Sequence, residues 1–80
     1  MMMRDVVLYT KASCCLCNDA KEALRVARAQ VEFALREVDI ESDPTLYAEH
    51  KYDIPVIEID GRRAFKHRVT ARQLLERLSR

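Results

Sequence analysis

Three cysteines lie within four positions near the start of the chain, as Cys14, Cys15 and Cys17. They follow a short apolar stretch, Val6–Tyr9, and they open a segment whose apolar residues have helical spacing. The pattern therefore predicts that Cys14 and Cys17 lie where a strand passes into the N-terminus of a helix. Unpaired backbone N–H groups and the helix dipole stabilise negative charge there, which favours the reactive thiolate form of cysteine. The spacing predicts a dithiol redox site.

The number and grouping of the cysteines leave other kinds of site open. An odd number of thiols packed so closely does not make a disulfide framework, which leaves catalysis or metal binding. The thiolates of Cys14, Cys15 and Cys17 could hold a soft metal or an iron–sulfur cluster, with His67 as a fourth ligand. The usual zinc pattern needs a second pair of ligands at set spacing, and the sequence offers none. A noncatalytic interaction domain with the same fold is a third alternative.

The other chemically notable side chains have structural interpretations. Cys15 is expected to be a partly exposed bystander, because adjacent cysteines bridge only with strained geometry. His50 and His67 are interpreted as surface or helix-packing residues rather than as ligands. The basic residues at 62–63 and 66–68 are interpreted as a solvated strand edge that resists pairing with another sheet.

The length and composition of the chain bound its class. Eighty residues fit a single domain spanning residues 1–80. Charged residues make up 34% of the chain and the formal net charge is +1, so the sequence lacks the one-sided basic field of a nucleic-acid binder. No apolar stretch is long enough for a membrane span or for the core of a signal peptide. We therefore expect a cytoplasmic monomer with neither nucleic-acid nor membrane partners.

The apolar pattern, together with a few residues typical of turns and helix starts, predicts the order strand, helix, strand, helix, strand, strand, helix. Asp43-Pro44 indicates a helix start, Asp60-Gly61 a tight hairpin turn, and Thr70 with Gln73 a capping box. Met1–Arg4 is expected to be a frayed start. The expected strands are Val6–Tyr9, Phe33–Ile40, Val56–Ile59 and Arg62–His67, and the expected helices run from the cysteines to about Arg28, from Pro44 to a point before Ile54-Pro55, and over Ala71–Leu78.

This order predicts an α/β fold with one four-stranded mixed sheet flanked by helices. The first three elements form a parallel unit with a right-handed crossover, and the last two strands form an antiparallel hairpin. If the third strand lies antiparallel beside the first, Pro55 falls next to the cysteine loop. The start of the last helix, near Thr70, comes to the same end of the sheet. Pro55 and Thr70 are therefore candidate substrate contacts.

Two motifs and a turn carry a resemblance to a known group of proteins. Lys11-x-x-Cys14-x-x-Cys17 follows the first expected strand, Asp53-Ile54-Pro55-Val56 precedes the third, and Asp60-Gly61 makes the hairpin turn. Over Val6–Leu78 the chain resembles the thioredoxin-fold superfamily and, within it, the small glutaredoxin-like proteins. The C-x-L-C variant, followed by Asn18-Asp19-Ala20, looks most like a glutaredoxin-like family that differs from the typical glutaredoxins.

The resemblance implies a β-α-β-α-β-β-α thioredoxin-like fold and suggests roles for several residues. Cys14 would be the exposed nucleophile and Cys17 the resolving thiol behind it. The Ile54–Pro55 bond would be cis, exposing backbone groups of Ile54 that pair with an extended thiol-bearing substrate. Lys11 corresponds to a lysine that helps to hold the thiolate and the carboxylate of glutathione.

The chain also departs from the typical pattern. Glutaredoxins have proline and an aromatic residue between the cysteines, where this chain has Cys15 and Leu16. They also carry a Gly-Gly pair and an acidic residue that contact glutathione before the last helix, where this chain has His67–Thr70. We expect a thiol–disulfide oxidoreductase that needs no bound cofactor, with glutathione or a reductase as electron donor. The expected substrates are disulfide-containing proteins or glutathione mixed disulfides.

Overall fold

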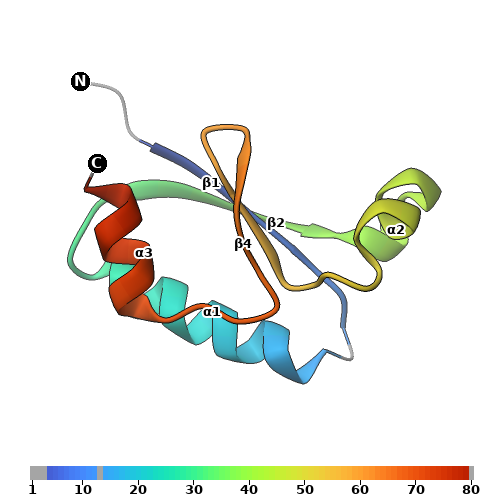
Figure 1. Cartoon of the computed structure of the whole chain (residues 1–80), viewed down its shortest axis with the longest axis horizontal. Coiled ribbons are helices and arrows are strands. Elements are labelled where there is room, and N and C mark those ends of the chain that lie inside the picture. The colour runs from blue at the N-terminus through green and yellow to red at the C-terminus, as the bar shows by residue number, and fades with distance from the viewer. Residues whose placement is uncertain (1–3, 13, 80) are drawn as a thin grey trace.

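Four strands and three α-helices make up the described part of the chain, in the order that the sequence predicts (Figure 1). The computed structural model describes residues 4–12 and 14–79. The strands are β1 (Arg4–Thr10), β2 (Phe33–Asp39), β3 (Val56–Ile59) and β4 (Arg62–Lys66), the helices are α1 (Cys15–Arg28), α2 (Pro44–His50) and α3 (Ala71–Leu78), and a 3-10 turn, η1 (Ile40–Ser42), precedes α2.

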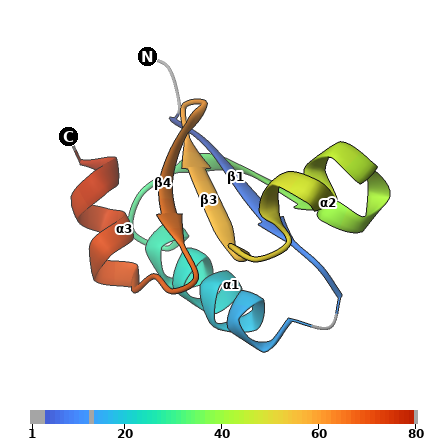
Figure 2. The ribbon, with the colours of Figure 1, turned by 45° about the vertical axis from the view of Figure 1, so that its right-hand side comes forward.

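The strands form one mixed sheet in the order β2-β1-β3-β4. β1 runs parallel to β2, so that Thr10 at the end of one strand lies beside Asp39 at the end of the other. β3 runs antiparallel to β1, with Val56 opposite Tyr9, and β4 returns beside β3 as an edge strand (Figure 2). This is the predicted mixed sheet, and it places the end of β1 beside the start of β3.

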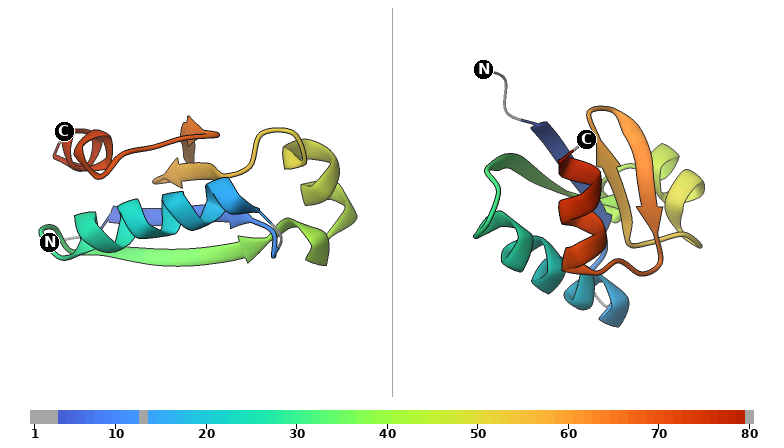
Figure 3. Two further views of the ribbon diagram at one scale, coloured as in Figure 1. Left: turned by 90° about the horizontal axis from the view of Figure 1, so that it is seen from below. Right: turned by 60° about the vertical axis from the view of Figure 1, so that its left-hand side comes forward.

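Helices α1 and α3 cover the face of the sheet toward which the apolar side chains of the central strands point (Figure 3). Val6 and Leu8 alternate along β1 on this face, and both are inaccessible to solvent. Removing this apolar surface from water is the main driving force for folding. The buried cluster consists of Val6, Leu8, Ala20, Ala23, Leu24, Ala27, Phe33, Ile57, Ile59, Leu74 and Leu78.

The start of β1 differs from the expectation of a frayed segment at residues 1–4. Arg4 opens the strand and pairs with Phe33 of β2. Its guanidinium also donates to the carboxylate of Asp60 and, at 3.2 Å, to the carbonyl of Leu78. These tertiary partners, which the local sequence does not reveal, hold Arg4 in the sheet. Residues 1–3 lie outside the described residues.

The hairpin between β3 and β4 has the predicted tight turn. Asp60 and Gly61 have φ angles of 53° and 83°, the left-handed region that a two-residue turn between twisted strands requires. The expected returning strand is one residue too long, because β4 ends at Lys66 and His67 also adopts a left-handed φ of 67°. His67 leaves the sheet at this point, and the chain crosses toward α3.

The segment between β2 and α2 also departs from the predicted boundaries. Ile40 begins η1 instead of ending β2, because the Asp39 carboxylate accepts from the Glu41 backbone N–H at 2.9 Å and starts the 3-10 turn. Asp43 then caps α2 by accepting from the Thr45 N–H at 2.8 Å, as predicted. Helix α2 lies beyond the end of the sheet at which β1 and β2 finish (Figure 3).

Helix α3 begins with the predicted capping box. The Thr70 hydroxyl accepts from the Gln73 N–H at 3.1 Å, and the Gln73 amide oxygen accepts from the Thr70 N–H at 2.9 Å. These reciprocal bonds satisfy two backbone donors that would otherwise lack partners at the helix start. No helix among the described residues is long and apolar enough to cross a membrane.

Candidate dithiol site

Cys14 forms the N-cap of α1. Its sulfur accepts a hydrogen bond from the Cys17 backbone N–H at 3.2 Å, and its own N–H donates to the Lys11 carbonyl at 3.3 Å. The first turn of α1 contains no acidic residue, so no carboxylate there opposes negative charge on the sulfur. The half-buried Cys14 sulfur therefore lies where helix N–H groups and the dipole stabilise an anion.

Cys17 lies behind Cys14 and is buried, with 1% of its surface exposed. Burial raises the pKa of the Cys17 thiol, and a hydrogen bond with the Cys14 side chain raises it further. The nearby Thr10 hydroxyl and Lys11 backbone lower the same pKa, but they do not outweigh burial. The two thiols therefore differ: one is accessible at the helix start and the other is sheltered and held protonated.

Cys15 is exposed, as the sequence predicts for a bystander, and all three cysteines are free thiols. The three thiols sit at different depths, since Cys14 is half-buried and Cys17 buried. Among residues 4–12 and 14–79, no group of three or more His, Cys, Asp or Glu side chains could hold a metal ion. His67, considered as a fourth ligand, is instead engaged with the backbone of Tyr52, at 3.1 Å.

The loop before β3 lies against the cysteine pair. The Ile54–Pro55 peptide bond is cis, in agreement with what the resemblance implies. Ile54 is buried in a small cluster with Cys17 and Ile40, against which Cys14 packs. The Ile54 N–H donates to the His50 carbonyl at 3.1 Å. While that bond is kept, only the carbonyl of Ile54 can pair with a substrate backbone.

His67 joins this loop to the end of β4. Its backbone N–H donates to the carbonyls of Pro55, at 2.9 Å, and Asp53, at 3.2 Å. The Asp53 carboxylate also forms an ion pair with Arg63 of β4 at 3.4 Å. The sequence suggested a surface or packing role for His67, or a fourth metal ligand, and did not indicate the left-handed backbone with which His67 joins these two loops.

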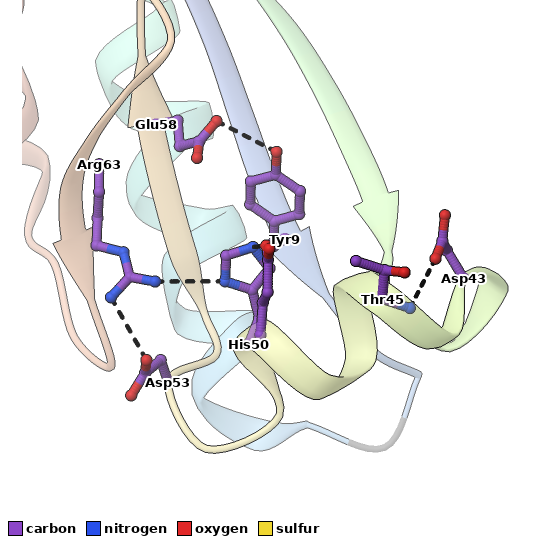
Figure 4. Close-up of polar contacts among 8 residues, drawn as sticks. Tyr9, Asp43, Thr45, His50, Asp53, Glu58 and Arg63 are labelled. Carbon is purple, nitrogen blue, oxygen red and sulfur yellow. Dashed lines mark hydrogen bonds and ion pairs between the residues drawn. The ribbon is translucent and has the colours of Figure 1, made fainter.

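A ring stack supports the loop from the other face of the sheet (Figure 4). The Tyr9 and His50 rings lie 4.4 Å apart, and the Tyr9 hydroxyl donates to Glu58 at 3.2 Å. His50 is 5% exposed and lies 3.5 Å from Arg63, so Arg63 contacts both His50 and Asp53. Burial, followed by the nearby Glu58 carboxylate, raises the pKa of Tyr9. His50 is thus a packing residue.

The two outer candidate substrate contacts lie in different pockets. Thr70 lines a pocket of about 230 Å³ together with Leu16 and Asp19 of α1 and with residues 67–69 and 73. Its hydroxyl and N–H are already engaged in the capping box. Lys11 lines a separate pocket of about 260 Å³ at the ends of β1 and β2. The structure therefore does not bring Lys11 and Thr70 into one pocket.

Sequence reasoning missed Thr10, a neighbour of Cys17. Thr10 is 7% exposed and follows Val6 and Leu8 on the inner face of β1. The alternation along the strand was the signal that could have found it, because it places a hydroxyl inside the core directly before the cysteine loop.

Comparison with known proteins identifies the family. Residues 5–79 match the glutaredoxin-like domain (DUF836), which is nearly the whole chain. The chain belongs to this family. A curated relative, the glutaredoxin-like protein YDR286C homolog of Dictyostelium discoideum, is 32% identical over 71 residues. That match covers 81% of this glutaredoxin-like chain and 66% of the relative, so the chain spans slightly less than two thirds of that protein.

Solved structures confirm the thioredoxin-like fold of this glutaredoxin-like domain. The X-ray structure of target protein XcR50 from X. campestris is 31% identical, with a TM-score of 0.79, and the match covers 92% of this chain and 95% of that one. Reduced desulfothioredoxin from Desulfovibrio vulgaris Hildenborough is 25% identical, with a TM-score of 0.71, and the match covers 98% and 80%. Family and fold together support a redox type of function.

Proposed function

We propose that this domain is a thiol–disulfide oxidoreductase that cycles between a Cys14/Cys17 dithiol and a disulfide. The observation that carries the proposal is the position of Cys14, whose sulfur accepts the Cys17 N–H at 3.2 Å at the start of α1. This placement supplies a hydrogen bond and a dipole that favour the thiolate, which is the nucleophile in disulfide exchange.

In the first step, Cys14 attacks a substrate disulfide. The Cys14 thiolate forms a new S–S bond to one substrate sulfur while the substrate S–S bond breaks and the other sulfur leaves as a thiolate. The electron count is unchanged at this stage, because one disulfide replaces another. The half-buried position of Cys14 leaves its sulfur reachable, whereas Cys17 is too buried to react first.

In the second step, Cys17 resolves the mixed disulfide. Its thiol loses a proton, and the resulting thiolate attacks the Cys14 sulfur and expels the second substrate sulfur as a thiolate. The substrate has then gained two electrons, and the protein holds a Cys14–Cys17 disulfide. An external reductant returns two electrons to restore the dithiol: either two glutathione molecules, which leave as glutathione disulfide, or a thioredoxin-type reductase.

Substrate binding is proposed to use the loop and the pocket on either side of the cysteine loop. The Ile54 carbonyl, beside Pro55, is the backbone group left to pair with an extended substrate. The pocket near Thr70 includes Arg68, which suits a substrate with a carboxylate, such as a glutathione mixed disulfide. Lys11 would act from the opposite side, through its charge. We propose that the domain works as a monomer in the cytoplasm.

The decisive experiment compares two single cysteine variants in the reduction of a glutathione–peptide mixed disulfide. Cys14→Ser should abolish the reaction because it removes the nucleophile, whereas Cys15→Ser, one residue away and exposed, should retain it. Activity that persists in Cys14→Ser would refute the proposal. Parallel coupling of the oxidised protein to glutathione with its reductase, and to thioredoxin reductase, identifies the electron donor.

A further inference from the structure

The end of β4 meets the loop before β3 through one residue, His67. Its backbone N–H donates to the carbonyls of Pro55, at 2.9 Å, and Asp53, at 3.2 Å. Nε2 of its ring lies 3.1 Å from the carbonyl oxygen of Tyr52. A carbonyl can only accept, so this bond requires the ring hydrogen on Nε2. His67 therefore engages three of the four carbonyls from Tyr52 to Pro55.

The fourth carbonyl of this loop belongs to Ile54. It accepts no hydrogen bond from the residues that the structure describes. Ile54 itself is buried with Cys17, in the cluster against which Cys14 packs. The loop thus keeps one backbone acceptor for an outside donor, and that acceptor belongs to a residue of the cysteine cluster.

Packing does not explain the ring of His67. The side chain is 51% exposed, so it buries little apolar surface. Its backbone φ of 67° lies in the left-handed region, which few residues other than glycine adopt. Such a conformation persists where surrounding contacts enforce it, and it is frequent at functional sites. The contacts that enforce it here are the hydrogen bonds to the loop before β3.

We propose that His67 is a positioning residue for substrate binding. By holding the neighbouring carbonyls, it orients the loop so that the Ile54 carbonyl accepts from a backbone N–H of the substrate. The inference rests on the proposed function, in which Cys14 attacks the substrate disulfide. It favours disulfides carried by a peptide chain, because a disulfide without a peptide group has no backbone N–H to donate.

Three variants separate the ring bond from the backbone conformation. In His67→Gln, the amide nitrogen can take the place of Nε2, because it is the same number of bonds from Cβ. In His67→Asn, the side chain is one carbon shorter and does not reach the Tyr52 carbonyl, although asparagine tolerates a positive φ better than glutamine. His67→Gly adopts a positive φ freely and has no ring. A backbone effect and a ring effect therefore predict opposite orders.

The two substrates differ in their backbone. One is a disulfide-linked pair of short uncharged peptides, and the other is bis(hydroxyethyl) disulfide, which has no peptide group. Each is mixed in excess with the reduced protein over a range of concentrations. Mass spectrometry after an acid quench follows the formation of the Cys14–Cys17 disulfide in a single turnover.

In His67→Asn and His67→Gly, the peptide concentration that gives half the maximal rate should rise about fivefold, with the maximal rate unchanged, because one hydrogen bond to the substrate is weakened. Their reaction with bis(hydroxyethyl) disulfide should not change, and His67→Gln should behave as the parent protein with both substrates. Urea unfolding confirms that the variants are folded.

The opposite results are equally clear. An unchanged His67→Asn, a His67→Gln that is impaired as much as His67→Asn, or an equal slowing with both disulfides would overturn the positioning role of the ring. A parent protein that reduces neither disulfide would overturn the proposed function itself, and the inference with it.

Discussion

The Cys14 sulfur lies 3.2 Å from the backbone nitrogen of Cys17, so that one cysteine caps the helix that carries the other. The same hydrogen bond therefore has a structural and a chemical consequence. It satisfies a helix donor that would otherwise lack a partner, and it stabilises negative charge on the sulfur that the proposed reaction uses. The two consequences can be separated by substitution.

Removing the resolving thiol should trap the first intermediate. In Cys17→Ser, the mixed disulfide with a glutathionylated peptide should persist on Cys14, because the remaining thiol, Cys15, is adjacent to Cys14 and could displace the substrate only by forming a strained bridge. Mass spectrometry of the intact protein and of its peptides locates the adduct. Cys15→Ser/Cys17→Ser is the matched control and should trap the same adduct. An adduct on Cys15 would contradict the roles assigned to the three thiols.

Capping by Cys14 can be measured apart from reactivity. Cys14→Ser keeps a side chain that accepts from the Cys17 N–H, whereas Cys14→Ala removes the cap. Both variants should be inactive, and the free energy of unfolding of Cys14→Ala should be lower than that of Cys14→Ser by about 1 kcal/mol. Urea unfolding of the reduced proteins provides the comparison. Equal stability would show that the observed cap contributes nothing.

Most of the fold could be predicted because its signals are local. Asp60-Gly61 sets the hairpin turn, Asp43-Pro44 starts α2, and the Thr70/Gln73 box starts α3, each through bonds between residues close in sequence. The strand boundaries that were predicted wrongly depend on partners distant in sequence, or on a side chain that competes with the sheet for backbone hydrogen bonds. Arg4 stays in β1 through contacts with α3 and the hairpin, and the Asp39 carboxylate ends β2 early.

The candidate site was predictable only in part for the same reason. The spacing of Cys14 and Cys17 after a strand indicated the helix cap, because that relation is contained within a few residues. The stacking of Tyr9 on His50 joins residues that are 41 positions apart in the sequence, and no local sequence pattern indicates it. The positive φ of His67 is similarly concealed: histidine is enriched at positive φ, but only a few per cent of non-glycine residues adopt it, so the residue type alone does not indicate it.

The raised pKa of Cys17 predicts a loss of stability at alkaline pH. Burial, the main cause, makes the folded protein hold the Cys17 proton more tightly than the unfolded chain does. Stability from this group is present below the ordinary pKa of 9.0 and is lost as the pH rises through the folded value. Unfolding free energies of the reduced protein should therefore fall more steeply above that pH than those of Cys17→Ser. If the unfolding free energies of the two proteins fell equally with rising pH, the raised pKa of Cys17 would be contradicted. The pKa of Tyr9 is also raised, but Tyr9 is present in both proteins, so its contribution cancels in the comparison.

Arg68 tests whether the pocket beside α3 receives a carboxylate-bearing substrate. Arg68 lines that pocket with Leu16 and Thr70, so Arg68→Glu should raise the KM for a glutathione–peptide mixed disulfide about two- to fivefold, the range expected of an exposed charge pair. Arg28→Glu, at the far end of α1, changes the net charge equally and should leave the KM unaltered. Steady-state kinetics at two ionic strengths should show the Arg68 effect weakening as salt increases. An equal rise in both variants would assign the effect to the overall charge of the protein, and an unchanged KM in Arg68→Glu would place the substrate elsewhere.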